Sequence, residues 1–312
     1  MDEFQIINKY FLQKNLGSGV ILGIGDDGAA ISHNSSSDLI TVVDTIIAGV
    51  HYPKHIAAED VGYRALAVNL SDIAAMGAKP RWMTLALTLS SSDDSWLKGF
   101  AKGFFELAQE FNVNLVGGDT TKGSETVITV NILGEVQKGK ILKRSGAKAG
   151  DSIYVSGTLG DAAAGLFCLK ELQEPFLGSK KFLVDRFLRP SPRLELGCSI
   201  LNSASSCIDL SDGLYADLFK LLDSSGVSGI IEMNDLPISK QIVEVIGREK
   251  AVYLALSGGD DYELCFTSSD DFISESDLKV TKIGTVTNGS GLSCRLNGSN
   301  FAFHSQGYRH FS

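Results

Sequence analysis

The chain has 312 residues, of which 44% are hydrophobic and 21% charged, and its formal net charge is −9. This length predicts two domains, because single hydrophobic cores stop growing at about 250–300 residues. The acidic balance and the lack of a Lys/Arg-rich run exclude an ordinary nucleic-acid-binding protein, which needs a basic surface. No apolar segment reaches the roughly 18–20 residues that span a bilayer, and the N-terminus lacks signal-peptide features. We therefore expect a soluble, cytoplasmic protein with no membrane partner.

The first half of the chain alternates between strand and helix patterns. Strands are predicted from β-rich or alternating residues at 39–47, 82–89 and 125–136. Helices with one apolar face are predicted at 59–76 and 94–111. Gly77 stands where a glycine commonly ends a helix.

The segment 138–151 is basic, contains glycines and has no sustained periodicity, so it predicts a domain boundary. We expect an N-terminal domain over residues 1–138 and a C-terminal domain over 139–312. In the second block, strands are predicted at 152–156, 206–210 and 262–267, and helices at 161–172 and 213–223. Strands and helices mixed in both halves predict two α/β sandwich-like domains.

The five cysteines are odd in number, and no pair has the C-x-x-C spacing. Each lies in or beside an apolar stretch. This pattern indicates reduced, packed thiols in a cytosolic protein, and it disfavours a disulfide framework or a zinc site.

Aspartates recur at the ends of apolar strands or beside glycines. The group includes Asp27, Asp44, Asp72, Asp119, Asp209, Asp212 and Asp260. A carboxylate beside a packed core is costly unless it is paired or bound to a metal ion. Converging carboxylates with few basic neighbours therefore predict a site for hard cations, and magnesium fits best because it prefers oxygen ligands shared with phosphates.

Structural roles compete with metal binding at some of these positions. Taken alone, Asp212 before Gly213 is better explained as a helix N-cap. The segment 26–28 (DDG) is typical of a turn. Asp72 lies near the C-terminal end of a predicted helix, where the macrodipole disfavours a carboxylate, so a metal ligand is the better interpretation there.

Glycine-rich turns predict phosphate binding. The segment 117–121 (GGDTT) offers backbone N–H groups and hydroxyls beside a carboxylate, a combination suited to phosphate and its metal. The chain has no Walker A motif and no protein-kinase motifs. The segment 23–28 has the G-x-G-x-x-G spacing, but its two aspartates would face a pyrophosphate, which disfavours dinucleotide binding.

Together, these motifs resemble the thiamine-monophosphate kinase family, within the larger group similar to aminoimidazole ribonucleotide synthetase and selenophosphate synthetase. The resemblance covers nearly the whole chain in order. It is carried by GIGDDGAA (23–30), VVDTIIAGVHY (42–52), ALAVNLSDIAAMGAKP (65–80), LVGGDTTKG (115–123), LKRSGAKAGD (142–151), RPSPRLELG (189–197), IDLSDGLYADL (208–218), LSGGDDYELCFT (256–267) and GYRHF (307–311).

The resemblance implies a two-domain fold, in which the N-terminal sheet pairs in a homodimer to form a closed barrel. ATP and several Mg²⁺ ions are expected between the domains. Positions that match the family's magnesium ligands are Asp27, Asp44, Asp72, Asp119, Asp209 and Asp212. Positions that match its ATP contacts are Gly118, Asp119, Arg144 and Ser211. Positions assigned to thiamine monophosphate are His51, Asp260 and Tyr308.

Three departures from the family pattern bear on substrate fit. Val42 and Val43 stand where the family often has Ser-Thr, and Asp260 replaces a common glutamate. Near the C-terminus, where the family can present an aromatic side chain, this chain has the segment 304–308 (HSQGY).

The expected activity is ATP-dependent transfer of a phosphoryl group to thiamine monophosphate. Its phosphate is already a nucleophile at neutral pH, with a second pKa near ~6, so no catalytic acid or base is assigned. His51 could act as a base, although positioning is preferred. The alternatives are a sister synthetase for aminoimidazole ribonucleotide or selenophosphate, and a non-catalytic nucleotide or metal sensor.

Overall fold

The computed structural model describes residues 2–12, 17–25, 28–171, 175–269, 272, 278–305 and 307–308. It divides into two compact units, each built from helices and a sheet, so the predicted two-domain α/β fold is confirmed. The first unit comprises Met1–Ile73 and Ala78–Gly139, and the second comprises Ala74–Gly77 and Lys140–Ser312. The main division therefore lies one residue from the predicted boundary, whereas the assignment of 74–77 to the second unit has no signal in the sequence.

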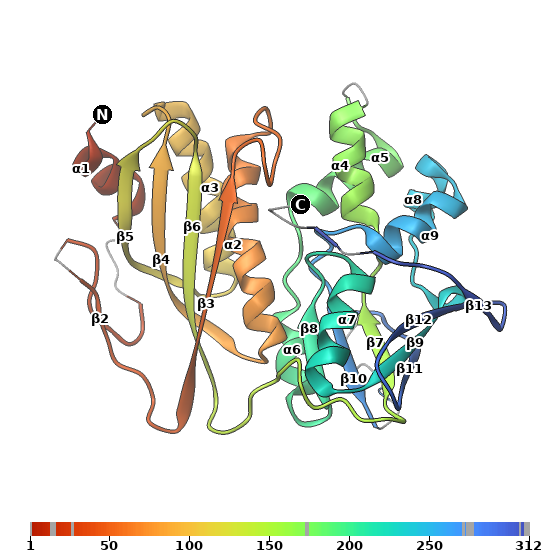
Figure 1. The fold of residues 1–312 in the computed structure, drawn as a ribbon. Helices are drawn as coiled ribbons and strands as arrows, with labels where there is room; N and C mark the ends of the chain where they lie inside the picture. The colour runs from red at the N-terminus through yellow and green to blue at the C-terminus, as the bar shows by residue number, and fades with distance from the viewer. Residues whose placement is uncertain are drawn as a thin grey trace. The chain divides into compact units, whose positions relative to one another are not determined.

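The first unit is a four-stranded mixed sheet with strand order β3-β6-β4-β5. The strands are β3 (Ser37–Ile47), β4 (Lys79–Leu89), β5 (Asn114–Lys122) and β6 (Val127–Gln137). β4 and β5 are parallel, and the other pairs are antiparallel. The helices α2 (Ala58–Ala75) and α3 (Asp94–Glu110) lie behind the sheet in Figure 1. The chain enters through α1 (Glu3–Ile6), a π-helical turn (Ile7–Phe11) and the short strands β1 (Val20–Leu22) and β2 (Ala30–Ile31).

Alternation along the strands gives this sheet one buried face. In β6, Ile128, Val130 and Ile132 are at most 1% exposed, while the residues between them are partly exposed. On the other face, Val43 of β3 is 60% exposed. The described residues thus form an open sheet and no closed barrel, so the barrel part of the expectation would need a second copy.

The second unit is a seven-stranded sheet with order β13-β12-β9-β11-β7-β10-β8. Its strands are β7 (Ser152–Ser156), β8 (Ser206–Asp209), β9 (Ser228–Glu232), β10 (Leu264–Ser268), β11 (Val280–Thr287), β12 (Gly291–Leu296) and β13 (Ser299–Phe301). Its helices are α4 (Asp161–Glu171), α5 (Gly178–Leu188), α6 (Leu194–Ser199), α7 (Leu214–Ser225), α8 (Lys240–Ile246) and α9 (Arg248–Ser257). β9 and β12 are parallel, and the remaining pairs are antiparallel. All residues of β10 are buried, and this strand pairs with β7 on one side and β8 on the other.

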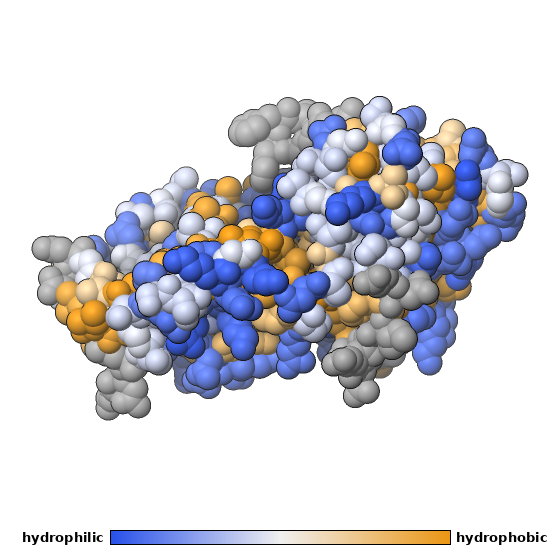
Figure 2. All heavy atoms as spheres, turned by 90° about the horizontal axis from the view of Figure 1, so that it is seen from below, coloured by the Kyte–Doolittle hydropathy of each residue, from blue (hydrophilic) through white to orange (hydrophobic). Residues whose placement is uncertain are grey.

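The cysteines are arranged as expected from their apolar surroundings in the sequence. All five cysteines are free, and four are buried. Across the part of the chain that the structure describes, no helix is long and apolar enough to cross a membrane. Figure 2 shows hydrophilic and hydrophobic residues intermixed on one face of the molecule.

The two helices of the first unit cross in backbone contact, which their glycines allow. A Cβ atom added at Gly103 would lie 1.8 Å from the carbonyl oxygen of Glu59, and one at Gly62 would lie 2.1 Å from that of Phe100. Neither carbonyl can move without disturbing its helix. The α2–α3 crossing therefore depends on glycine at these positions.

Gly103→Ala should destabilise the protein by about 1–3 kcal/mol, because the new methyl group overlaps backbone. Gly99→Ala is the matched control in the same helix, since its Cβ would lie 3.2 Å from the Cβ of Ala58 and needs only a small shift. Both changes gain about 1 kcal/mol of helix propensity, so their difference isolates the steric effect. Urea unfolding followed by circular dichroism measures it, and equal effects of the two changes would contradict the close crossing.

Candidate functional site

In the first unit, Asp44 and Asp72 lie on the same side of the sheet. β3 is an edge strand, and the backbone N–H of Asp44 donates to Oδ1 of Asn69 in α2 at 2.8 Å. Asn69 is fully buried and donates in turn to the carbonyl of Ala65 at 3.0 Å. Asp72 follows Asn69 by three residues, so it projects from the same face of α2. The amide of Asn69 thus fixes the backbone of Asp44 against the helix that carries Asp72.

His51 folds back onto the end of β3. Its Nδ1 accepts a hydrogen bond from the backbone N–H of Ile47 at 3.0 Å. An accepting Nδ1 carries no proton, so the neutral ring has its proton on Nε2 and presents a donor. This tautomer favours positioning of an anionic group by His51 over proton abstraction.

Gly118 and Asp119 lie within β5, so the predicted glycine-rich turn at 117–121 is wrong. A Cβ at Gly118 would lie 1.9 Å from the carbonyl oxygen of Leu85, which shows that glycine is required for close strand pairing there. β5 is an edge strand, and only one of its two edges is paired. Gly118 therefore serves the pairing of β4 with β5.

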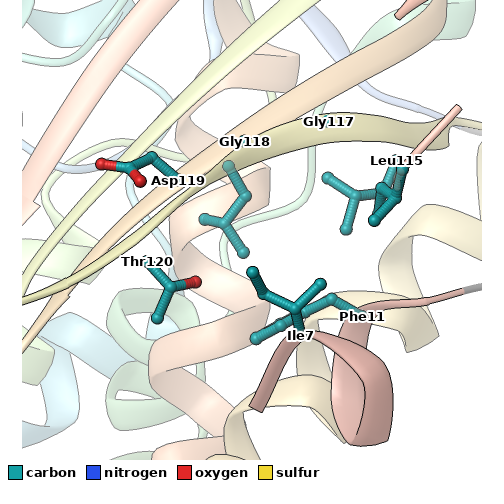
Figure 3. Close-up of a pocket in the computed structure, with 9 residues that line it drawn as sticks. Ile7, Phe11, Leu115, Gly117, Gly118, Asp119 and Thr120 are labelled. Carbon is teal, nitrogen blue, oxygen red and sulfur yellow. The ribbon is translucent and has the colours of Figure 1, made fainter. Parts of the chain in front are cut away.

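A small pocket of about 50 Å³ adjoins this strand (Figure 3). Its lining is mostly apolar and includes Ile7, Phe11, Leu115, Gly118 and Asp119. In Figure 3 the carboxylate of Asp119 points away from Ile7 and Phe11. The pocket has room for a few water-sized groups, so as it stands it is too small for a nucleotide.

Asp44 and Asp119 lie on opposite edges and opposite faces of the same sheet. Asp44 is opposite Val130, on the buried face, whereas Asp119 is opposite Ala86, on the other. Three strand spacings of about 4.8 Å separate β3 from β5, or about 14 Å. Within this unit the two carboxylates would therefore bind separate cations.

In the second unit, two predicted motifs are paired through their backbones. The N–H of Asp260 donates to the carbonyl of Ser211 at 2.9 Å, and that of Tyr262 donates to the carbonyl of Leu210 at 2.9 Å. In the other direction, the N–H of Leu210 donates to the carbonyl of Glu263 at 2.8 Å. These bonds extend the pairing of β8 with β10, and they place a predicted ATP contact, Ser211, beside a predicted substrate contact, Asp260.

Two non-glycine residues of this segment have left-handed backbones. Asp260 has φ +70° and Tyr262 has φ +50°. Such conformations cost about 1–3 kcal/mol each and persist only where the surroundings enforce them. Gly259 lies between the two segments in close contact, because a Cβ there would be 2.5 Å from the carbonyl oxygen of Ser211. The strain coincides with the predicted substrate contact.

The C-terminal segment lies against the same place. A Cβ at Gly307 would be 2.7 Å from the Cβ of Ala216 and 3.1 Å from the carbonyl oxygen of Asp212. The next residue, Tyr308, is 51% exposed. The structure thus brings Asp212, Ser211, Asp260 and Tyr308 together at the N-terminal end of α7.

Lys220 and Asp217 belong to this region, although the sequence analysis missed both. Nζ of Lys220 donates to Asp212 Oδ2 at 2.6 Å and to Asp217 Oδ1 at 2.8 Å, and Asp217 Oδ2 accepts from the N–H of Asp212 at 2.9 Å. Burial raises the pKa of Asp217 to about 6, although Lys220 counteracts the shift. The i,i+3 spacing of Asp217 and Lys220 was a signal for this pair.

The interpretation of Asp212 as a helix N-cap is wrong. The N-cap of α7 is Gly213, and no side chain makes a capping hydrogen bond there. The carboxylate of Asp212 instead contacts Lys220.

Arg144 lies at the other end of α7. Its carbonyl accepts from the hydroxyl of Ser225, the last residue of that helix, at 3.1 Å. A helix of 12 residues is about 18 Å long. The backbone of Arg144 is therefore distant from Ser211, although both are predicted ATP contacts.

Comparisons with known proteins agree with this architecture. Family models described as AIR synthase related protein match the chain with their N-terminal domain at residues 25–136 and their C-terminal domain at 148–297. The thiamine-monophosphate kinase of Haemophilus influenzae is 43% identical over 284 residues, which cover 91% of this chain and 86% of the relative. The chain belongs to the thiamine-monophosphate kinase family.

Solved structures of this family have the same fold. The thiamine-monophosphate kinase of Stenotrophomonas maltophilia is 41% identical, covers 94% of each chain and superposes with a TM-score of 0.85. A second structure, AaThiL complexed with AMPPCP and TMP, is 32% identical and has a TM-score of 0.83, covering 99% of this chain and 96% of that one. These matches confirm the family resemblance stated from the sequence.

The predicted magnesium ligands are all aspartates, and their carboxylate oxygens are the type of donor that Mg²⁺ prefers. Asp27 lies outside the described residues. Among those that the structure describes, no three His, Cys, Asp or Glu side chains group closely enough to hold an ion by themselves. Magnesium commonly takes one or two carboxylates and completes its shell with water and phosphate oxygens. Two carboxylates would therefore be enough for each ion, which leaves Asp44, Asp72, Asp209 and Asp212 as candidate ligands.

Lys220→Met should lower the melting temperature more at pH 8 than at pH 5.5. The folded pKa of Asp217 is raised above its unfolded value, so its contribution to stability is lost as pH rises through about 6. Without the ammonium group this pKa rises further, since burial and the nearby carboxylates of Asp209 and Asp212 remain. Calorimetry at both pH values tests it, with Lys220→Met/Asp217→Asn as the control: without the titrating carboxylate, the extra loss of stability at pH 8 should disappear.

Proposed function

We propose that this chain phosphorylates thiamine monophosphate to thiamine diphosphate, with ATP as donor and Mg²⁺ as cofactor, by direct in-line transfer. The main observation behind the proposal is the structural match with AaThiL, which covers nearly the whole chain. That structure was solved in complex with TMP and AMPPCP, an ATP analogue. The convergence of Ser211, Asp212, Asp260 and Tyr308 in the second unit supports it, because predicted ATP, metal and substrate positions meet there.

The chemistry needs positioning rather than a base. The acceptor phosphate has a second pKa near ~6 and is already a nucleophile at neutral pH. The main obstacle is repulsion between two polyanions brought into line. Magnesium, held by Asp44 and Asp72 and by Asp209 and Asp212, would supply neutralising charge. The Nε2–H of His51 and the guanidinium of Arg144 would donate to phosphate oxygens.

Two other functions give different products. A synthetase for aminoimidazole ribonucleotide or selenophosphate would leave thiamine monophosphate unchanged in the presence of ATP. A nucleotide or metal sensor would bind ATP without turnover. Incubation with ATP, Mg²⁺ and thiamine monophosphate, followed by chromatography for the diphosphate, distinguishes the proposed kinase from both alternatives.

We also propose a cytoplasmic homodimer. The free cysteines fit a reducing compartment, where the ATP-using reaction would take place. The uncovered face of the first sheet exposes Leu39 and Val43, which suits association with a second copy through this face.

Asp44→Asn and Asp72→Asn should abolish turnover while the fold remains intact. Each change removes a charge from the proposed metal pair but preserves side-chain size. Asp235→Asn, an exposed aspartate in the second unit, is the matched control and should keep normal activity. Rates of diphosphate formation and far-UV circular dichroism measure the two effects, and a near-normal rate in either variant removes that residue from the metal set.

Val43→Lys should yield monomers, because a dimer through the open sheet would bury the new charge. Val50→Lys is the control: Val50 is 54% exposed and lies outside the strands. Light scattering coupled to gel filtration reports the mass, and a dimeric Val43→Lys variant would exclude this face as the interface.

A further inference from the structure

The second unit holds a buried ionic cluster next to residues 260–262, the strained segment that contains the two left-handed residues. The carboxylate of Glu263 is fully buried and accepts from Arg193 through Nε at 2.6 Å and through a terminal nitrogen at 2.5 Å. Arg186 donates to it at 2.8 Å, and the hydroxyl of Ser156 donates at 2.5 Å. Burial alone would raise the pKa of Glu263, but Arg193, Arg186 and Ser156 outweigh burial and lower it.

The partners of Glu263 come from separate elements. Ser156 ends β7, Arg186 belongs to α5, and Arg193 precedes α6. Gly157 completes the enclosure, because a Cβ there would lie 2.2 Å from Oε1 of Glu263. Several parts of the chain are thus organised around one carboxylate that has no assigned role in the reaction.

The cluster is joined to the backbone of the strained segment. Glu263 follows Tyr262 directly, and its carbonyl accepts from Leu210. Arg186 also reaches the carbonyl oxygen of Asp261 at 3.5 Å. The side chain of Asp261 accepts from the N–H groups of Gly160 at 2.6 Å and Ala162 at 3.2 Å. The residues on both sides of Tyr262 are therefore held, which leaves Asp260 and Tyr262 little freedom to relax.

Stability alone is a poor explanation for such a cluster. Replacing a buried ion pair with well-packed apolar side chains is often neutral or stabilising, because the desolvation of the charges offsets their attraction. The ionic groups instead fix an orientation. The bidentate contact of Arg193 orients the carboxylate of Glu263, and with it the backbone of that residue.

We propose that Arg186 and Arg193, acting through Glu263, are positioning residues for thiamine monophosphate. They hold Asp260 and Tyr262 in the left-handed conformations that place Asp260 beside Ser211. This inference rests on the proposed function, in which Asp260 contacts the substrate.

Glu263→Gln tests the proposal with little change of shape. It should raise the KM for thiamine monophosphate by about tenfold or more and change the KM for ATP by less than about threefold, since small misplacements of a contact are costly. Gly103→Ala is the control for general destabilisation, because it lies in the first unit, far in sequence from this segment. A Glu263→Gln variant in which both KM values change no more than in Gly103→Ala overturns the proposal.

The double variant Glu263→Met/Arg193→Met separates positioning from stability. It leaves one arginine, Arg186, without the carboxylate, whereas Glu263→Met alone leaves both arginines without it, so the double variant should melt at a higher temperature than Glu263→Met. The KM for thiamine monophosphate should stay raised. If stability and KM recover together, the cluster is only structural and the proposal fails.

Hydrogen exchange gives a readout that does not depend on turnover. The amides of residues 258–263 should exchange faster in Glu263→Gln than in the wild type, while those of α7 should be unchanged. Unchanged exchange in the segment contradicts the positioning role even if the wild-type protein does not phosphorylate thiamine monophosphate. A wild-type enzyme without that activity, but with the expected change in exchange, contradicts the proposed function alone.

Discussion

The backbone pairing of residues 209–213 with residues 258–263 is the constraint on which the second unit's site depends. β8 and β10 are adjacent antiparallel strands, and their hydrogen bonds continue past the end of β8 to Ser211 and Asp260. Two aspartate-rich segments almost 50 residues apart are therefore held side by side. Glycine at 259 permits the contact, and the left-handed residues beyond it turn the chain back into β10.

The first unit distributes its acids differently. The backbone of Asp44 is hydrogen-bonded to Asn69 of α2, the helix that also carries Asp72, whereas Asp119 lies across the sheet on an edge strand. Charge neutralisation along a polyphosphate can use carboxylates in separate cation positions, since each magnesium ion needs few protein ligands. The arrangement suits a site with several ions better than a single cage of aspartates.

Ionic groups appear in two roles in the second unit. Lys220 and Asp217 contact a predicted metal ligand directly, through the side chain and the backbone of Asp212. The cluster at Glu263 instead contacts the backbone next to Asp260, the predicted substrate contact. Both surround their charges with hydrogen-bonding partners, which is how a protein interior tolerates ionised groups.

Periodicity and composition determined the secondary structure of most segments, because a helix or strand with one buried face leaves its repeat in the chain. β3, β4, β6, α2 and α3 all begin and end within three residues of their predicted bounds. The order of the motifs along the chain was sufficient to identify the family. The segment 117–121 shows the limit of local reasoning: its glycines are typical of a turn, but the segment lies in β5, and Gly118 allows close pairing with β4. Only the tertiary structure decided that Asp119 lies across the sheet from Asp44 and that Arg144 is at the far end of α7. Those facts depend on strand order and helix packing, which bring together residues that no sequence spacing relates.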